Sequence, residues 1–234
     1  MVSMSLPILL VPGLACTDEV FAPQISALWP YGSVMVANTL DGDSMATMAA
    51  SILAAAPPQF ALGGISMGGY LCFEIIRQAP ERVLKLALLD TSARPDRPEA
   101  AELRRSRVAL VRQGDVERST VEAFPAMVHP DHLGDQALMQ LSIRMTRAIG
   151  AEAFSRQQEA IIARPDSRPG LGAIRVPTLM LVGEADQMTP PEVAREIAEG
   201  IPGARLSIVP QSGHMSTHEN AAVVNAALVE WARS

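Results

Sequence analysis

Short apolar runs and stretches of mixed polarity alternate from residue 6 to residue 90 of the chain. The continuous apolar runs are typical of strands that are buried on both faces, and they fall at residues 8–11, 33–37, 60–65 and 83–89. Between them, apolar residues recur at helical spacing, which predicts helices at residues 18–29, 45–56 and 67–78. Because strands that are separated by helices pair in parallel, we expect an α/β protein with a mostly parallel sheet.

The alternation stops between residues 92 and 171, where the pattern predicts helices and no strand. Turn-rich sequences at residues 94–98 and 164–170 open and close this stretch, which we call the inserted segment. One helical pattern in it ends at Gly150, and Pro125 is expected to break another that covers residues 116–124. We expect the inserted segment to be a small helical cap that lies over the sheet.

Strand and helix patterns return after the inserted segment. Strands are predicted at residues 178–182 and 206–209, and helices at residues 190–198 and 219–231. A chain of 234 residues suits one large domain, or one domain with an insertion. The expected organisation is therefore an α/β core formed by residues 1–91 and 172–234, with a helical cap formed by residues 92–171.

Composition and charge exclude several classes of protein. Hydrophobic residues make up 48% and charged residues 19%, a globular balance, and the net charge of −6 argues against a nucleic-acid binder. The two cysteines are too few for a disulfide framework. The first apolar run has no basic start, and no run approaches the roughly 18 apolar residues of a membrane span, so we expect a cytoplasmic protein without membrane attachment.

The strongest chemical signal is Gly64-Ile65-Ser66-Met67-Gly68, between a predicted strand and a predicted helix. A serine at such a sharp turn is held in a strained backbone conformation that exposes its hydroxyl, and the flanking glycines relieve the crowding. The helix that follows directs backbone N–H groups toward the same place. Ser66 is therefore the candidate nucleophile, whereas an ordinary glycine-rich turn is the plain alternative.

A serine nucleophile needs a base, and the chain has four histidines. His214 follows the last predicted strand, at the sheet edge where strand ends deliver catalytic residues, and is the favoured base. His218 is the alternative, on the first turn of the last helix. His129 and His132 belong to the inserted segment, and we expect them to face solvent.

A carboxylate must orient the histidine and stabilise its charged form. Asp186 follows the predicted strand at residues 178–182, and the chain order serine, aspartate, histidine suits this architecture. Glu184 and Asp90, which also follow predicted strands, are the alternatives. Each of the three carboxylates has a plain alternative role as the cap of a turn.

Backbone N–H groups are needed for the oxygen of a tetrahedral intermediate. The amide that follows the nucleophile belongs to Met67, and the second donor is expected in the loop after the first strand, where Leu14 is the candidate. In that loop Cys16 and Thr17 are expected to serve ordinary packing and helix capping, with lining of the pocket as the alternative. No metal site is expected, because no helix places His129 and His132 on one face, and His214 with His218 lacks a convincing third ligand.

The chain resembles compact α/β-hydrolase-fold serine hydrolases, a group with small esterases, enol-lactonases and cofactor-free haloperoxidase-like members. The resemblance covers nearly the whole length. Its carriers are Leu10-Val11-Pro12-Gly13, Gly64-Ile65-Ser66-Met67-Gly68-Gly69, Ala79-Pro80-Glu81-Arg82-Val83, Leu181-Val182-Gly183-Glu184-Ala185-Asp186, Met188-Thr189-Pro190 and Gly213-His214. One departure is Pro12-Gly13, where many members carry His-Gly, so the hydrogen bonding of the oxyanion loop must differ.

Together these features predict cleavage of carboxylic esters through an acyl-enzyme, without a cofactor, by a monomer or homodimer. The inserted segment is expected to wall the pocket for a small-molecule ester or lactone, with apolar contacts from Met127, Met139, Met145 and Phe154. Arg104, Arg105, Arg107 and Arg112 are interpreted as a solvated helix face, with attraction of an anionic substrate as the alternative. Lactone, enol-lactone or C–C bond hydrolysis by the same triad, and a non-catalytic receptor for a small ligand, stay open.

Overall fold

A computed structural model describes residues 6–234, in which six strands form one parallel sheet in the order β2-β1-β3-β4-β5-β6. The predicted α/β architecture is confirmed, and the predicted apolar runs coincide with strands to within one residue at either end. The strands are β1 (Ile8–Val11), β2 (Val34–Val36), β3 (Phe60–Ile65), β4 (Val83–Leu89), β5 (Thr178–Gly183) and β6 (Arg205–Val209).

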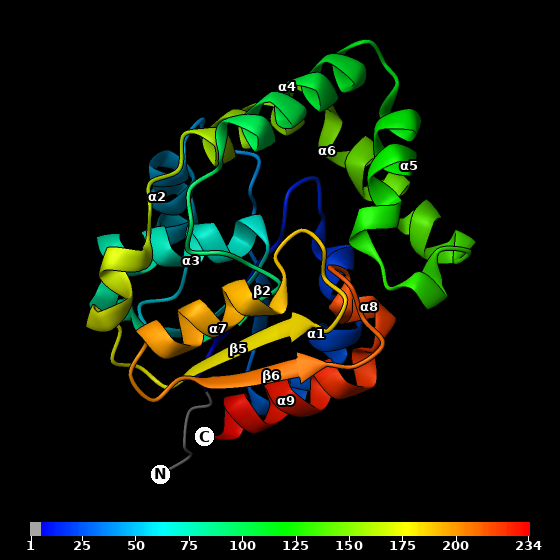
Figure 1. Cartoon of the computed structure of the whole chain (residues 1–234). Coiled ribbons are helices and arrows are strands. Elements are labelled where there is room, and N and C mark those ends of the chain that lie inside the picture. The colour runs from blue at the N-terminus through cyan, green and yellow to red at the C-terminus, as the bar shows by residue number, and fades with distance from the viewer. Residues whose placement is uncertain (1–5) are drawn as a thin grey trace.

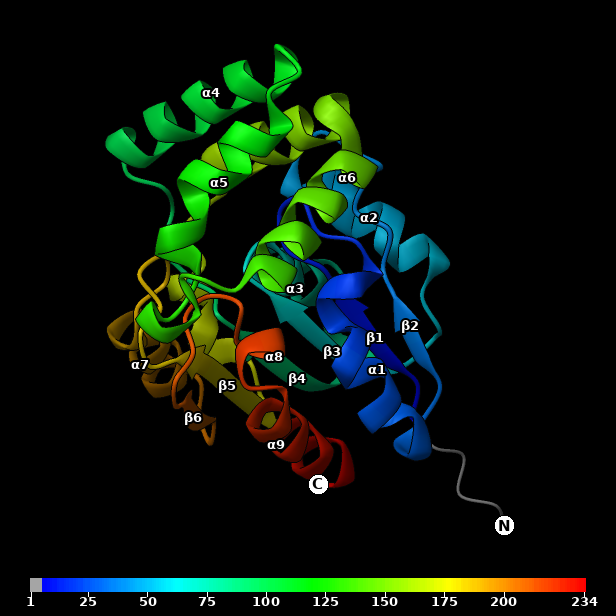
Figure 2. The same ribbon diagram turned by 90° about the vertical axis from the view of Figure 1, so that its right-hand side faces the viewer.

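Helices cover both faces of the sheet (Figures 1 and 2). One face packs against α2 (Met45–Ala55), α3 (Met67–Gln78) and α7 (Pro191–Gly200). The other face packs against α1 (Ala22–Leu28) and α9 (Ala221–Arg233). This double cover explains why most residues of the central strands are apolar, whereas the edge strand β6 alternates with polar residues such as Arg205 and Ser207.

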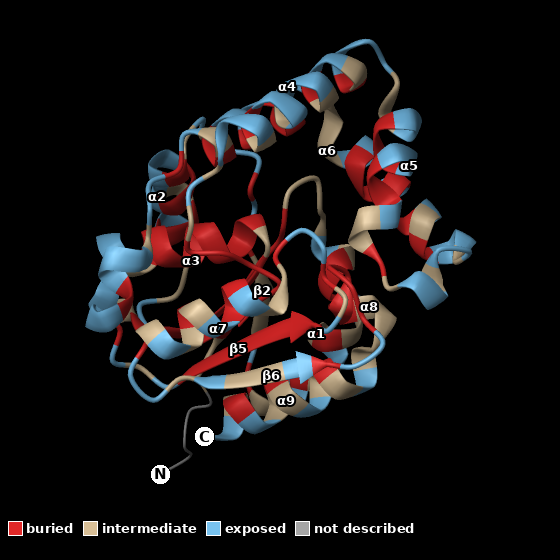
Figure 3. Ribbon diagram, viewed as in Figure 1, coloured by how far each residue is buried: buried red, intermediate tan, exposed pale blue. Residues whose placement is uncertain are grey.

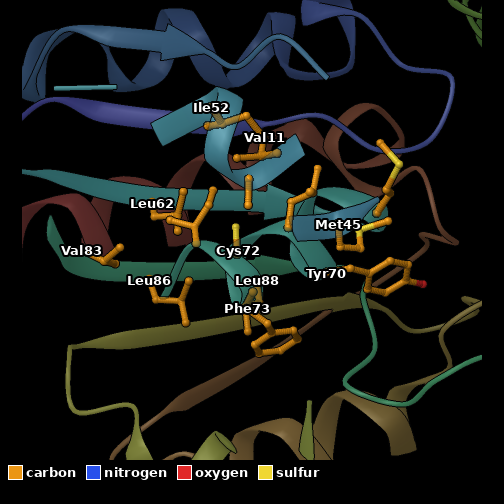
Figure 4. Packing of buried hydrophobic residues seen from close by; sticks show 14 of the residues in the cluster. Val11, Met45, Ile52, Leu62, Tyr70, Cys72, Phe73, Val83, Leu86 and Leu88 are labelled. Carbon is orange, nitrogen blue, oxygen red and sulfur yellow. The ribbon is translucent and has the colours of Figure 1, made fainter. Parts of the chain in front are cut away.

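The two cores take alternate residues of each strand. In β1, Leu9 and Val11 belong to the first core, and Ile8 and Leu10 to the second. Figure 4 shows Cys72 and Phe73 of α3 packed beside strand residues of the first core, Leu88 among them. Strand β5 is buried from end to end, whereas the edge strand β6 is partly exposed (Figure 3). The central strands therefore provide the rigid platform of the site.

The inserted segment forms α4 (Pro98–Arg112), α5 (Val116–Met127) and α6 (Gln136–Ile162), with short 3₁₀ turns η4 (Pro130–His132) and η5 (Arg168–Ala173). These three helices lie together on one side of the sheet, far from the C-terminus (Figure 1). A left-handed residue, Gly150, separates two halves of α6. The division into core and cap domains at residues 92 and 171 stays a prediction.

Three predicted helices differ from the structure. Pro125 lies inside α5 and does not break it: the missing N–H removes one i→i−4 hydrogen bond, and only two helical residues follow. The helix expected at residues 18–29 is divided into η1 (Asp18–Phe21), α1 and η2 (Trp29–Tyr31), with prolines near the starts of the last two. The last helix is split into α8 (Ser216–Glu219) and α9, which Asn220 caps through its side chain.

Candidate active site

The turn between β3 and α3 holds Ser66 in an unusual backbone conformation. Its φ of 53° and ψ of −115° lie in a region that costs a non-glycine residue about 1–3 kcal/mol. Two hydrogen bonds hold the turn: the Ser66 N–H donates to the Leu89 carbonyl at 2.9 Å, and the Thr91 hydroxyl donates to the Ser66 carbonyl at 2.7 Å. The strained turn expected from the sequence is present, and its partners come from the end of β4.

Two glycines make this turn possible. A Cβ on Gly68 would lie 2.0 Å from the carbonyl oxygen of Val11, and a Cβ on Gly64 would lie 2.4 Å from the carbonyl oxygen of Gly68. Both distances are far below van der Waals contact. The start of α3 can approach β1 and β3 this closely only because both positions lack a side chain.

His214 lies in the loop after β6, and its Nε2 is 2.9 Å from the Ser66 Oγ. The backbone N–H of His214 donates to the carbonyl of Met127 at 2.8 Å, so the backbone of this loop is bonded to the inserted segment. The carboxylate of Glu219 accepts the N–H groups of Gly213 and Met215, on either side of the histidine, at 2.8 and 3.1 Å. Both neighbours of His214 are therefore held by one side chain.

The same carboxylate also binds the inserted segment. It accepts the N–H of His129 at 2.6 Å, and Gly213 packs so closely on this segment that a Cβ there would lie 2.6 Å from the backbone of Val128. Glu219 is not recognisable from the sequence, because no local motif marks it and His129, the partner that ties it to the inserted segment, is 90 residues away.

Asp186 lies behind the histidine, in the loop after β5. Its Oδ2 is 2.8 Å from the Nδ1 of His214 and accepts the Thr189 hydroxyl, also at 2.8 Å. Its Oδ1 accepts the N–H groups of Met188 and Thr189 at 2.8 and 2.9 Å. Since a carboxylate only accepts hydrogen bonds, the Nδ1 of His214 carries the proton, and Nε2 is left to accept from Ser66.

The two alternative carboxylates do not touch His214. Asp90 is fully buried, and its oxygens accept from the Gly183 N–H at 2.9 Å and lie 2.6 Å from the Ser216 hydroxyl. Glu184 accepts the Gln211 N–H at 2.5 Å in a more exposed position. The structure therefore brings Asp186, not Asp90 or Glu184, into line with His214 and Ser66.

The pKa values of His214, Asp186 and Asp90 depend on their burial and on the charges beside them. Burial alone would lower the pKa of His214, but the Asp186 carboxylate raises it above the ordinary value. For Asp186, burial opposes ionisation, yet the imidazole and the Thr189 hydrogen bonds lower its pKa. Burial and then the charge of Asp186 raise the pKa of Asp90 to about 8. At neutral pH the negative charge therefore resides on Asp186, beside the histidine.

The other three histidines lie apart from this chain of hydrogen bonds. The His218 ring is on α8, 2.8 Å from the Glu19 carbonyl. His129 and His132 do not face solvent as expected: their side chains are only 16% and 28% exposed. His129 accepts the Asp131 N–H through its Nδ1, at 3.2 Å.

A cavity of about 130 Å³ opens beside Ser66 and His214. It lies at the carboxyl ends of β1 and β3, where the chain leaves β1 toward one edge of the sheet and β3 toward the other. Loops that part in this way leave a crevice, which is where ligands bind in open α/β sheets. Its lining comes from the loop after β1, from Tyr70 on α3, from α4, α5 and α6, and from the loops that carry Asp186 and His214.

The two candidate oxyanion-hole amides belong to the loop after β1 and to the turn after β3, which both border the cavity. Leu14 lines the cavity, and Met67 is the first residue of α3, where helix N–H groups lack intrahelical acceptors. Within residues 6–234, neither amide donates a hydrogen bond to another residue. The next amide along the loop, that of Ala15, donates to the Gln157 side chain at 3.0 Å, which holds the loop against α6.

Three of the four expected cap residues line the cavity: Met127, Met145 and Phe154. Met139 does not, and packs against the second core instead. It lies one turn before Ser142, which does line the cavity, on the same face of α6. One turn of helix rises about 5.4 Å, enough to carry Met139 beyond the edge of the cavity.

The remaining sequence candidates show no sign of other chemistry. Cys16 lines the cavity, but burial raises its pKa to about 12, so it is a thiol and not a reactive thiolate. Thr17 accepts the Glu19 N–H and caps η1. In the described residues, 6–234, His, Cys, Asp and Glu form no cluster of three that could hold a metal ion. Over the same range, no helix combines the length and apolar character needed to cross a membrane.

Fold and site together define an α/β protein in which a serine on a strand–helix turn, a histidine and an aspartate form one hydrogen-bonded chain beside a cavity. The family described as alpha/beta hydrolase fold matches residues 43–221, and the chain belongs to it. This confirms the resemblance that the sequence motifs indicate.

Similar proteins include several named enzymes. A thermophilic esterase from Thermogutta terrifontis, solved with malate bound, is 30% identical with a TM-score of 0.88, over 97% of this chain and 89% of that one. The enol-lactonase from Burkholderia xenovorans LB400 shares the fold, at 23% identity and a TM-score of 0.89, over 98% and 92% of the two chains. A Variovorax paradoxus protein with the provisional name carbamate hydrolase RutD is 26% identical over 96% of this chain and 90% of its own. These relatives assign the chain to the hydrolase class of enzymes.

Proposed function

We propose that this protein is a serine hydrolase that cleaves carboxylic esters of small or medium acyl or aryl substrates. The observation that carries the proposal is the unbroken chain from Ser66 Oγ through the His214 imidazole to Asp186, with contacts of 2.9 and 2.8 Å, beside a cavity. The esterase name of the Thermogutta relative supports the choice of an ester bond.

In the first half of the reaction, Ser66 Oγ attacks the ester carbonyl carbon while its proton passes to the Nε2 of His214. The imidazolium that forms is stabilised by Asp186, whose other contacts hold it in place. The tetrahedral intermediate then collapses, the bond to the leaving oxygen breaks, and His214 returns the proton to that oxygen. The products are a free alcohol and an acyl-serine.

In the second half, water attacks the acyl-serine and gives a proton to His214. Collapse of the second intermediate releases the carboxylic acid, and the proton returns to the Ser66 oxygen. The free amides of Leu14 and Met67 are our candidates for the oxyanion hole in both halves. Loss of one such donor typically costs about 10²–10³ in kcat.

The test combines labelling with a substrate panel. A fluorophosphonate probe should label the wild-type protein at Ser66 and leave Ser66→Ala unlabelled. Aryl esters of increasing acyl length should be hydrolysed by the wild type, with only residual turnover by Ser66→Ala. Equal turnover by both proteins would refute the proposal, and a wild type that neither reacts with the probe nor cleaves any substrate would favour a non-catalytic receptor.

The same chemistry opens lactones, and the panel should include them together with carbamates, because two similar proteins carry those names. Lactone turnover far above that of any aryl ester would make ring opening the main activity. Either result keeps Ser66 as the nucleophile, so the panel separates the bond that is cleaved from the residues that cleave it.

A further inference from the structure

Two arginines of α4, Arg104 and Arg107, line the cavity that contains Ser66. The sequence analysis interpreted their cluster as a solvated face. In the structure that interpretation holds for Arg105 and Arg112, which are exposed, whereas Arg104 and Arg107 are partly buried. The wall of a mostly apolar cavity therefore carries cationic groups.

The two cavity arginines differ in their partners. Arg104 donates to Asp96 at 2.6 Å and to the Gln158 side chain oxygen at 3.1 Å. Arg107 forms no hydrogen bond or ion pair with any residue of the part of the chain that the structure describes. Burial, and then the positive charge of Arg104, lower the pKa of Arg107. A guanidinium nevertheless stays protonated at neutral pH, so within residues 6–234 this charge has no ion-pair partner.

A second donor without an acceptor lies in the same wall. Gln158 of α6 lines the cavity and is fully buried, and its Nε2 has no hydrogen-bond partner among the described residues. A buried amide N–H₂ without an acceptor costs free energy, and native proteins usually satisfy such groups. Arg104 donates to the amide oxygen, so the group of Gln158 that still needs a partner is its N–H₂ donor.

The charge balance around this wall is positive. Asp96 is the buried carboxylate here, and both Arg104 and Arg164 are paired with it, each at 2.6 Å. Arg164 also lies over the ring of Tyr70, a cavity residue, 4.2 Å from its centroid. Glu122 of α5, whose charge acts on Arg107, is exposed and paired with Arg118. One carboxylate thus serves two guanidinium groups, before Arg107 is counted.

We propose that Arg107, with the Gln158 amide beside Arg104, binds a carboxylate carried by the substrate, so that the enzyme prefers half-esters of dicarboxylic acids. The inference rests on the proposed ester hydrolysis and names its substrate class. A carboxylate only accepts hydrogen bonds, and its planar pair of oxygens matches a guanidinium. The apolar walls from Met127, Met145 and Phe154 would then hold the methylene chain between the ester and the carboxylate.

The test compares charged and neutral esters of the same length. For the wild type, kcat/KM for monomethyl glutarate and monomethyl adipate should exceed that for the matching dimethyl esters by about 10- to 100-fold, as one charge-assisted hydrogen bond warrants. In Arg107→Gln this ratio should fall toward one, mainly through a higher KM for the half-ester. Added salt should also reduce the wild-type ratio.

Arg105→Gln is the matched control, because Arg105 is on the same helix and exposed, outside the cavity. It should keep the wild-type ratio. Arg107→Lys, which restores a charge without the planar fork, should recover part of the preference. A wild type that cleaves diesters as well as half-esters, or an Arg107→Gln variant that loses both activities equally, overturns the proposal.

A binding experiment keeps this inference separate from catalysis. Titration calorimetry with glutarate should show binding to Ser66→Ala and a loss of at least about tenfold in affinity for Ser66→Ala carrying Arg107→Gln. Binding of inorganic phosphate in place of glutarate contradicts a carboxylate site. Glutarate binding without hydrolysis of any ester would refute the proposed function and leave the anion site standing.

Discussion

Asp186→Asn tests the proposed catalytic chain most directly, because the two side chains have the same size and shape. The Asn oxygen can still accept the N–H groups of Met188 and Thr189, as Oδ1 does in the wild type. The new N–H₂ group then takes the place of Oδ2, 2.8 Å from the Nδ1 of His214. It can only donate there, so Nδ1 must accept and the imidazole proton moves to Nε2.

An Nε2–H that faces Ser66 cannot take the serine proton, so the base is in the wrong tautomer. In a serine protease the same exchange lowers kcat by about 10⁴, which corresponds to about 5.5 kcal/mol of activation free energy. We expect a loss of about 10³–10⁴ here, with little change in KM. Because the Asp186 charge raises the pKa of His214, activity of the wild type should be lost as the pH falls through a value above 6.5, and in the variant the residual activity should persist to lower pH.

The assay is the pH dependence of kcat and kcat/KM with an aryl ester, together with thermal unfolding to show that the variant is folded. Asp90→Asn is the matched control. Asp90 does not contact His214, and an amide can keep both of its contacts, so activity should stay within about threefold of the wild type. A folded Asp186→Asn with more than a tenth of wild-type kcat, or an equal loss in Asp90→Asn, would refute the assignment.

Three further predictions concern stability and the position of the base. Since the pKa of Asp90 is raised from 3.8 to about 8, the free energy of unfolding should fall as the pH rises between those values, and urea titrations should show a flatter dependence for Asp90→Asn. Glu219→Ala removes the acceptor of three backbone N–H groups near His214. We therefore expect a loss of at least about 2 kcal/mol in the free energy of unfolding, measured in urea, and a lower kcat. An unchanged kcat would contradict the positioning role of Glu219. Gly68→Ala should lower the free energy of unfolding by about 2–3 kcal/mol, because its Cβ would clash with a β1 carbonyl. For the control Gly170→Ala, where a Cβ would meet open space, the loss should be about 0.5 kcal/mol or less. Similar losses for both variants would contradict the close approach of α3 to β1.

The sequence was sufficient where structure depends on local pattern. The strands at residues 60–65 and 83–89 have the predicted bounds, because both runs are mostly apolar and end in buried apolar residues. The strained turn at Ser66 is likewise encoded locally, by Gly64 and Gly68. Asp186 and His214 were found because parallel strands deliver the residues that follow them to one edge of the sheet.

Features that depend on backbone geometry without a sequence motif, or on packing between distant segments, were not predictable in this way. The break before α9 depends on the local geometry at Asn220, within a pattern that reads as one helix. Glu219 binds loops that are far apart in sequence, and no motif distinguishes it from a surface acid. The burial of Arg107 and Arg104 depends on how α4 packs over the cavity, while their helical spacing matches that of a solvated face.

The bond from the His214 N–H to Met127, and the bond from His129 to Glu219, have a consequence for engineering and evolution. The backbone of His214, the proposed general base, is bonded to residues at the end of α5, so we expect that α4–α6 cannot be exchanged as an independent unit. Replacing residues 92–171 with a foreign helical lid should displace the imidazole even when every core residue is kept. We expect that substrate specificity can be changed by substitutions of cavity side chains on α4 and α6 that keep the hydrogen bonds of Met127 and His129.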